Sequence, residues 1–262
     1  MRTLFIAIFV LMYSHSLFSA TLEETLKKEI DVTGQQNFTI ENLNGKIKVE
    51  GWDKSLVSIE ARKQVKASDK ETAREILEAL EVIIDIDDEI ISVSVNHPNQ
   101  KSGSGFLAWL FDDHRWNASV DFTVYIPHKM NMDVSSTNGK LQILQCEGLL
   151  NLETTNGSID GEHLSGSVNC NTTNGSVKIY MNEVSIDKDM KFSTTNGSIK
   201  LYLPKSINAN IEANTVNGNV VCDLPVKDVD QQSRKKLRAR INAGGPVLVL
   251  KTTNGSIHLK AS

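Results

Sequence analysis

Apolar and polar residues alternate on both sides of a short motif that recurs through the second half of the chain. The motif is Thr-Asn-Gly followed by Ser or Lys and then by Ile or Leu. Successive asparagines stand 18 to 22 residues apart, except for one interval of 37 residues. A period of about 20 residues is typical of one coil of a repeat solenoid. The asparagines are Asn138, Asn156, Asn174, Asn196 and Asn254, with Val216-Asn217-Gly218 as a variant and Leu43-Asn44-Gly45 as an isolated early copy.

Alignment of the copies on this asparagine shows a common pattern of apolar positions. The residues six and four places before it, and three and five places after it, are apolar, whereas those between them are mostly polar. This alternation predicts two β-strands per coil, each with one face toward a core and one toward water. Gly161 is the one exception. The inward pairs include Met132/Val134, Leu150/Leu152, Val168/Cys170, Met190/Phe192 and Leu248/Leu250 before the asparagine, and Leu141/Ile143, Val177/Ile179, Ile199/Leu201 and Ile257/Leu259 after it.

The repeat also predicts how the strands pair. Equivalent strands that recur at this period can each lie beside their own copy one coil away, which favours parallel pairing. Asn-Gly is expected to form the corner because glycine and, less readily, asparagine accept positive φ. The asparagines and the threonines two residues before them are expected to form polar ladders. A meander of antiparallel hairpins is the alternative, since Asn-Gly is also a hairpin turn. The longest insertion, residues 227–245, predicts a loop followed by a strand.

The front of the chain departs from the repeat. A capping box that begins at Ser68, followed by apolar residues at helical spacing, predicts a helix over residues 69–81. Residues 82–95 alternate like two strands that turn near Asp87 and Asp88. We expect this region to cover the open end of the stack, because an exposed strand edge invites pairing with other chains. The predicted fold class is all-β: a parallel β-solenoid of Asn-Gly-cornered coils with an N-terminal β-rich cap containing one short helix.

The first residues have the features of a secretory signal peptide. Arg2 precedes an apolar run over residues 4–13, which is too short to span a bilayer. Cleavage after Ala20 competes with cleavage after Ser16. No second long apolar stretch follows, and no cysteine stands where a lipid would be attached. We therefore expect an exported chain, in the periplasm or at the cell surface, with no transmembrane segment after signal removal. The predicted division is 1–20 for the signal peptide, 21–131 for the capping region and 132–262 for the solenoid repeats, the last two forming one continuous domain.

Composition and cysteine content narrow the possible functions. The chain has 28 Lys and Arg residues against 32 Asp and Glu, so it lacks the basic character expected of a nucleic-acid-binding protein. Cys146, Cys170 and Cys222 align with core positions of the repeat and are interpreted as buried small side chains. A bridge between Cys146 and Cys170 is an alternative. Packing rather than a disulfide framework is therefore expected to stabilise the fold.

The histidines show no metal-ligand spacing and are interpreted as scattered surface residues. The outward residues of successive coils mix charges instead of gathering acids and bases in one place, as a catalytic centre requires. We accordingly predict no catalytic residues, no metal site, no cofactor and no enzyme activity. The five histidines considered are His97, His114, His128, His163 and His258.

One candidate binding surface lies on two successive coils. Lys178 and Tyr180 recur one coil later as Lys200 and Tyr202, and all four have the outward parity. Aromatic side chains beside cations could hold a glycan. Ordinary cross-strand pairing on an exposed sheet is the alternative interpretation.

A second candidate surface is the most apolar short run after the signal. It follows a flexible polar and glycine stretch and is flanked by charged residues. It either protrudes as a patch for a partner or a membrane surface, or tucks against the core. Its apolar residues are Phe106, Leu107, Trp109, Leu110 and Phe111.

The segment IENLNGKIKVEGWD, the repeated TTNGSI turns and the closing INAGGPVLVLKTTNGSIHL occur in this order. Their combination resembles the bacterial putative adhesin domain, a family of exported β-strand-repeat proteins, over nearly the whole chain after the signal. The resemblance implies a β-solenoid at the cell envelope with an adhesive or scaffolding role and no assigned catalytic residues. The leading hypothesis is therefore a non-enzymatic protein that binds an envelope protein or a glycan. The alternative is a glycan-active enzyme or a glycan-binding module that uses an outward solenoid face.

Overall fold

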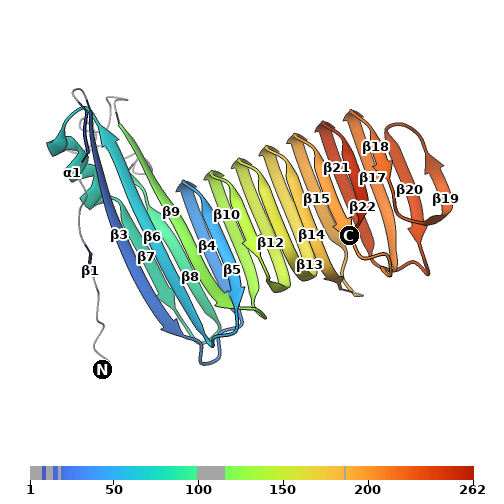
Figure 1. Cartoon of the computed structure of the whole chain (residues 1–262), viewed down its shortest axis with the longest axis horizontal. Coiled ribbons are helices and arrows are strands. Elements are labelled where there is room, and N and C mark those ends of the chain that lie inside the picture. Colours follow the sequence, from blue (N-terminus) through green and yellow to red (C-terminus); the bar gives the residue numbers. More distant parts are fainter. Residues whose placement is uncertain (1–7, 10–13, 17–18, 99–115, 186) are drawn as a thin grey trace.

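One curled, mixed β-sheet makes up most of the described part of the molecule, and the helix α1 packs near one end of it (Figure 1). The computed structural model describes residues 8–9, 14–16, 19–98, 116–185 and 187–262. Within these residues, 22 strands join one sheet. The prediction of an all-β fold with one short helix is confirmed for this part of the chain.

The repeat coils stand side by side, and each has a first strand that ends at its asparagine and a second strand that begins after it. Neighbouring coils pair in parallel through equivalent residues, as Asn156 does with Asn174. The first strands are β4 (Asn37–Asn44), β10 (Asn131–Asn138), β12 (Glu147–Asn156), β13 (Ile159–Asn174), β15 (Met190–Asn196), β17 (Ala209–Asn217) and β21 (Val247–Asn254). The second strands are β5 (Ile47–Trp52), β11 (Leu141–Leu144), the start of β13, β14 (Val177–Val184), β16 (Ile199–Leu203), β18 (Val220–Cys222) and β22 (Ile257–Ala261).

The coils follow a different order in space and in sequence. β21, the first strand of the last repeat, pairs in parallel with both β15 and β17. β22 likewise pairs with both β16 and β18. The last repeat is therefore inserted between two earlier ones. At the other end, β4 of the isolated early copy pairs directly with β10.

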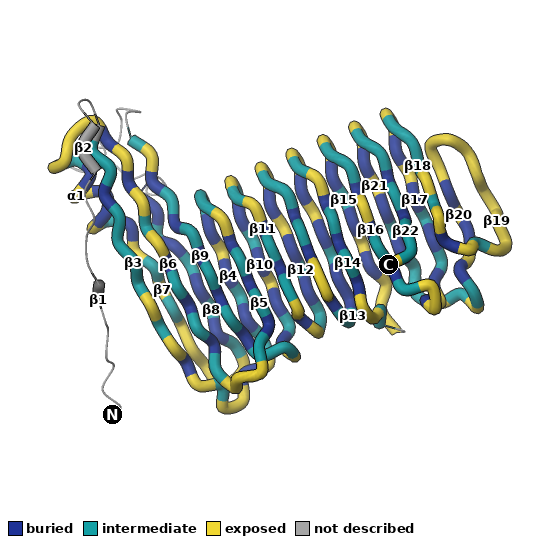
Figure 2. Tube along the Cα trace, in the orientation of Figure 1, coloured by how far each residue is buried: buried dark blue, intermediate teal, exposed yellow. Residues whose placement is uncertain are grey.

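Alternation along the strands builds a continuous apolar core. Figure 2 shows buried and exposed positions alternating along the stacked strands. Phe38, Phe122 and Phe192 are fully buried, and burial of a side chain of this size contributes roughly 1.5–3 kcal/mol. Gly161 fits the same core: a methyl group there would lie 2.6 Å from Leu164 Cδ1, because Leu164 fills the space that a side chain would occupy.

A ladder of asparagine side chains runs along the corners. Each Nδ2 donates to the Oδ1 of the asparagine in the neighbouring coil at 2.7 or 2.8 Å, from the Asn138–Asn44 pair to the Asn217–Asn254 pair. The threonines do not bond to one another. Thr172 Oγ1, for example, donates to the carbonyl oxygen of Gly157 at 2.9 Å. Both side chains thus tie each corner to the next.

The expectation that the Asn-Gly pair adopts positive φ is wrong in the repeat coils. The ladder asparagines have no positive φ, and among the glycines that follow them only Gly45, in the early copy, has one (121°). Glycine is required instead by the close approach of neighbouring coils. A methyl group at Gly175 would overlap the carbonyl oxygen of Gly157, and one at Gly197 would overlap that of Gly175.

Strands from outside the repeat, which pair with one another in antiparallel orientation, extend the sheet at the N-terminal end of the stack. β8 pairs in parallel with β4, and β9 pairs in parallel with β5. β6 is antiparallel to β9, and β3 is antiparallel to β6. These strands are β1 (Ile8–Phe9), β2 (Ser14–Ser16), β3 (Ser19–Asp31), β6 (Leu56–Ala67), β7 (Glu81–Ile86), β8 (Ile90–Asn96) and β9 (Asn117–Pro127).

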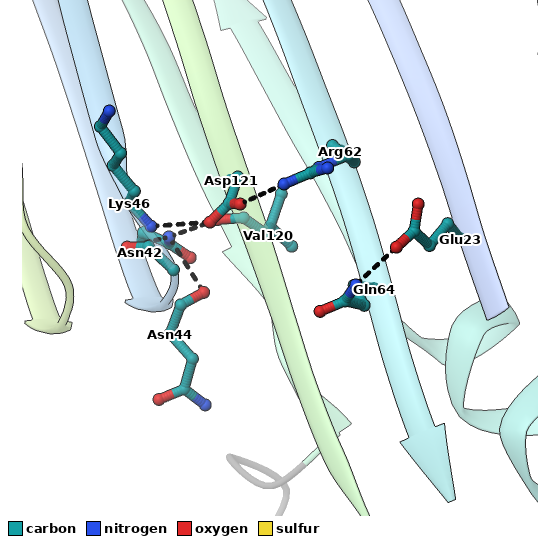
Figure 3. A network of polar contacts seen from close by, with 9 residues as sticks. Glu23, Asn42, Asn44, Lys46, Arg62, Gln64, Val120 and Asp121 are labelled. Carbon is teal, nitrogen blue, oxygen red and sulfur yellow. Dashed lines mark hydrogen bonds and ion pairs between the residues drawn. The ribbon is translucent and has the colours of Figure 1, made fainter. Parts of the chain in front are cut away.

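Polar contacts join this antiparallel part to the first corner of the stack (Figure 3). Asp121 accepts a hydrogen bond from the backbone N–H of Lys46 and forms an ion pair with Arg62, both at 2.9 Å. Asn42 Nδ2 donates to the carbonyl oxygen of Val120 at 2.8 Å. The corner between β4 and β5 is therefore held to β9 and β6 by side chains as well as by strand pairing.

The helix and the hairpin predicted for the front region are both present. α1 (Lys70–Ala79) begins after Asp69, whose side chain accepts from the backbone N–H of Thr72 at 2.9 Å. Asp69, rather than the expected Ser68, is thus the N-cap residue. β7 and β8 are antiparallel, and Asp87 accepts backbone hydrogen bonds in the turn between them.

The long insertion contains two strands where one was expected. β19 (Val226–Gln232) occupies the stretch predicted as a loop and pairs antiparallel with β20 (Lys236–Ile241). β20 in turn pairs antiparallel with β17 at the C-terminal end of the sheet. Most residues of β19 are exposed, so the strand carries no alternating apolar pattern from which it could be predicted.

Within the described ranges, no helix is long and apolar enough to cross a membrane.

Candidate functional site

The outer sides of the second strands form one surface, which we call the second-strand face. Parallel pairing of β5, β11, β13, β14, β16 and β22 sets equivalent side chains in rows across it. A β-bulge in β13 interrupts the rows between Gly161 and Leu164. The row four places after the asparagines contains Lys48, Gln142, Asp160, Lys178, Lys200, His258 and, on β18, Val221. The row six places after contains Glu50, Leu144, Glu162, Tyr180, Tyr202 and Lys260.

The structure brings together the four residues of the candidate ligand surface. Lys178 lies opposite Lys200, and Tyr180 lies opposite Tyr202, on the paired strands β14 and β16. The tyrosine ring centroids are 3.9 Å apart with an interplanar angle of 11°. Lys178 Nζ lies 5.0 Å from the centroid of the Tyr180 ring. Their role in binding stays a prediction.

This stacking changes what the tyrosines can offer a ligand. Each ring covers one face of the other, and Lys178 lies over the Tyr180 ring. The faces that the two tyrosines turn toward each other are therefore closed to a ligand. Hydroxyl groups and ring edges are the groups that the pair presents outward, and a tyrosine hydroxyl can both donate and accept a hydrogen bond.

Charge is distributed unevenly along the second-strand face. Toward β5, Lys48 pairs with Glu50 at 2.7 Å, and Asp160 pairs with Lys140. Toward β22, no ion pair involves Lys178, Lys200 or Lys260 in the described part of the chain. The contact with the Tyr180 hydroxyl raises the pKa of Lys178, so this ammonium group stays charged well above neutral pH.

A second aromatic cluster lies where β5 and β9 meet, and sequence reasoning missed it. Trp52 and Tyr125 stack with centroids 5.1 Å apart, and Lys54 Nζ lies 4.5 Å from the centroid of the Trp52 ring. The Trp52 indole N–H donates to the carbonyl oxygen of Leu56 at 2.9 Å. Trp52 follows Glu50 at the outward parity, which was a usable signal. Its partner Tyr125 comes from β9, outside the repeat, and the repeat alignment could not supply it.

One groove, with a volume of about 330 Å³, lies on the opposite side of the coils from the asparagine corners. Glu147 and Glu183 line it on either side of Ser165, and Lys188 lies at the same groove. Both carboxylates are exposed. No group of three or more potential metal ligands occurs among the described residues.

The histidines differ in their surroundings. His97 is 1% exposed, which corrects its interpretation as a surface residue, and burial lowers its pKa. His128 Nδ1 donates a hydrogen bond to the backbone carbonyl oxygen of Gln145 at 2.7 Å. His163 and His258 are at least partly exposed, as expected. His114 and the apolar run over residues 106–111 lie outside the described residues.

The cysteines are free thiols, so the alternative bridge between Cys146 and Cys170 is wrong. Cys146 and Cys170 are buried as predicted, whereas Cys222 is half-buried because it lies on β18 near the end of the stack. Burial raises the pKa of Cys146 to about 12 and raises that of Cys170 as well.

Alkylation of the folded protein by iodoacetamide should therefore modify Cys222 first and leave Cys146 and Cys170 unmodified, because only thiolates react and reagent must reach them. Peptide mass spectrometry after short exposures measures this order. The same reaction in denaturant is the control and should modify all three at similar rates. Equal modification of all three in the folded protein would contradict this burial.

The sequence and the fold are similar to those of known proteins. A family model described as Toastrack DUF4097 matches residues 29–260. Among solved structures, the chain is similar to a "putative cell adhesion protein" from Clostridium sporogenes at 15% identity, with 92% of this chain and 100% of that chain covered and a TM-score of 0.45. A "putative adhesin" from Bacteroides fragilis has 11% identity, 90% and 96% coverage and a TM-score of 0.36. A "putative lipid binding protein" from Parabacteroides distasonis has 11% identity, 90% and 96% coverage and a TM-score of 0.24. No curated protein matches the chain.

Proposed function

The chain belongs to the Toastrack DUF4097 family, and we propose that it is a non-enzymatic binding protein of the cell envelope, acting in adhesion or as a scaffold. The second-strand face is the surface that contacts the ligand, and a glycan is the ligand that suits it best. The observation that carries this proposal is the ordered pair of tyrosines with two lysines beside it, repeated from β14 to β16.

The sheet gives the side chains of this face a fixed support. The side chains of the face project from strands that pair on both sides and carry a buried core beneath them. A backbone fixed in this way has little conformational entropy left to lose when a ligand binds. The face is also long and shallow, which suits an extended polymer better than a small substrate that must be enclosed.

The finer description of the molecule belongs to the same proposal. The stack is a parallel β-solenoid with Asn-Gly corners, supported by the pairing between coils and by the asparagine ladder. The chain is exported to the periplasm or the cell surface after removal of residues 1–20, and residues 21–131 and 132–262 form one continuous domain. Edman sequencing of the protein purified from its native cells would test the cleavage, with a start near Thr21 expected.

A glycan-active enzyme is the second candidate, because Glu147 and Glu183 line one groove on either side of Ser165. Paired carboxylates of this kind act in glycoside hydrolysis when one is held protonated. Exposure of both carboxylates to solvent disfavours such a role. Chromatography of polysaccharides after incubation with the protein distinguishes the two candidates, because an enzyme shortens the chains and a binding protein leaves their length unchanged.

Substitution of Tyr180 and Tyr202 together by serine should weaken glycan binding several-fold and leave the protein folded. Loss of the stacked pair removes roughly 0.5–1.5 kcal/mol of ring contact from an exposed surface, which the buried core tolerates. Titration calorimetry measures the binding, and circular dichroism checks the fold.

The double substitution of the same residues by phenylalanine is the matched variant, because it keeps the rings and removes the hydroxyls. Since the rings cover each other, we expect it to lose nearly as much affinity as the serine variant. Unchanged affinity in the serine variant would place the ligand elsewhere, with the Phe106, Leu107, Trp109, Leu110 and Phe111 run as the remaining candidate for a partner or membrane surface.

A further inference from the structure

We propose that the C-terminal part of the second-strand face is a site for a carboxylate-bearing polysaccharide, that is, a linear polymer of uronic-acid type. This inference rests on the proposed glycan-binding function and specifies the chemical class of the ligand. The site, which we call the cationic grid, consists of three second strands, each contributing one residue of each row. Its residues are Lys178 and Tyr180 on β14, Lys200 and Tyr202 on β16, and His258 and Lys260 on β22.

The strand pairing places these six side chains in a regular array. Lys200 lies between Lys178 and His258 in one row. Tyr202 lies between Tyr180 and Lys260 in the other. His258 and Lys260 belong to the last repeat in the sequence, which is inserted beside β16 and not beyond β18. The grid therefore exists only because the coils follow a different order in space and in sequence.

Charge determines which ligands the grid can hold. Its three lysines have no carboxylate partner among the described residues, whereas Lys48 and Asp160 on the same face are each paired. On neighbouring strands, like charges that face one another repel, as Lys178 and Lys200 do, unless an anion lies between them. Asp160 on β13 lies opposite Lys178, and its ion pair is made with Lys140 on the side of the grid toward β5. An anionic ligand would therefore supply the charge that the protein does not.

The tyrosines favour a sugar carboxylate over an aromatic or apolar anion. Tyr180 and Tyr202 cover each other's faces, so stacking on an incoming ring is reduced, and their hydroxyls are the groups that face the ligand. A carboxylate accepts charge-assisted hydrogen bonds from ammonium groups, and the hydroxyls of the same sugar can bond to the tyrosine hydroxyls. The lysines thus select the charge and the tyrosines select the polyhydroxylated ring.

The spacing of the grid favours a polymer. Neighbouring strands lie about 4.8 Å apart, so the cations repeat along the stack at roughly the length of one sugar unit. A linear acidic polysaccharide that runs across the strands would meet a new cation at each coil. Several weak contacts made by one chain give a combined affinity that a single sugar acid does not reach.

Binding of polygalacturonate, of its methyl ester and of a neutral β-glucan to the full protein tests the inference. Polygalacturonate should bind most tightly, with an affinity that falls as salt rises, because the contacts are ionic. Its methyl ester, which keeps the sugar ring and loses the charge, should bind at least tenfold more weakly. Substitution of Lys200 and Lys260 by glutamine should weaken polygalacturonate binding by roughly tenfold, as expected for the loss of two charge-assisted contacts.

The matched control substitutes Lys191 and Lys251 by glutamine. These residues lie on β15 and β21, the first strands of the same two coils, and the change in net charge is the same. This variant should bind polygalacturonate like the wild type. An equal loss in both variants would overturn the inference, because it would show a response to net charge and not to the grid.

The remaining outcomes separate the inference from the proposed function. Equal binding of polygalacturonate and its methyl ester would overturn the acidic class and leave glycan binding standing. Tighter binding to single-stranded DNA or to vesicles with anionic lipid than to polygalacturonate would overturn the polysaccharide assignment. Failure of all three glycans to bind would count against both the inference and the proposed function.

Discussion

Replacement of Gly175 by alanine should lower the free energy of unfolding by about 3 kcal/mol, the upper part of the range for overpacking a well-packed site. The methyl group would overlap the carbonyl oxygen of Gly157 in the neighbouring coil, which is backbone and cannot rotate away. Relief requires the two coils to separate at a corner where Asn156 and Asn174 are hydrogen bonded and their strands are paired. For a chain of this length, the expected fall in melting temperature is roughly 6–12 °C.

The substitution of Gly34 by alanine is the matched control. A methyl group there would lie 3.6 Å from the carbonyl oxygen of Asp88, an ordinary contact, and the residue has no positive φ. Its melting temperature should change by no more than about 2 °C, consistent with the small effects of surface substitutions. A Gly175→Ala protein as stable as Gly34→Ala would contradict the close approach of the coils.

Replacement of Asn174 by proline should also be severely destabilising, by about 3 kcal/mol or more. Asn174 is paired on one side with Asn156 and on the other with Asn196, so it lies in the interior of the sheet. Proline has no backbone N–H for such a ladder and removes both side-chain hydrogen bonds of the asparagine at once. Urea unfolding measured by circular dichroism gives the change in free energy.

The substitution of Asn174 by alanine separates the effect of the lost backbone N–H from that of the lost side-chain hydrogen bonds. Asn174→Ala keeps the backbone N–H and loses only the side-chain hydrogen bonds, so we expect a loss of about 1–2 kcal/mol. If proline and alanine destabilised the protein equally, the backbone of Asn174 would not take part in the sheet as described. An alanine variant as stable as the wild type would show that the asparagine ladder contributes nothing.

The alternation of apolar residues was sufficient to predict the strands of the repeat, because burial of one strand face imposes a period of two. Residues such as Phe192 and Leu250, aligned only through their asparagines, lie opposite one another in the structure. The helix after Asp69 and the hairpin at Asp87 were also predictable, since capping and turn residues act locally.

The spatial order of the coils could not be predicted from the sequence. Equivalent strands carry nearly the same pattern, so β21 could pair with any copy of itself, and nothing local distinguishes a position beside β17 from one between β15 and β17. The close approach of neighbouring coils, which is why the motif needs glycine, could not be predicted either. Whether Gly175 needs positive φ or a close neighbour depends on the adjacent coil, and the motif is the same in both cases.

The candidate site was predictable only in part. The shared offset from the asparagine placed Tyr180 and Tyr202 on one face, but their mutual stacking depends on the separation and tilt of two rings. His258 and Lys260 entered the cationic grid only through the insertion of the last repeat beside β16. An alignment along the sequence places the last repeat after the Asn217 copy, so it could not show that β22 lies beside β16.

Binding of a glycan without cleavage is tested most directly on the wild-type protein, by an array of neutral and acidic glycans followed by chromatography of each glycan that binds. We expect saturable binding, strongest for the carboxylate-bearing polymers, and recovery of each bound glycan at its original length. No binding to any glycan, or recovery of shortened chains with new reducing ends, would contradict the role proposed for the second-strand face.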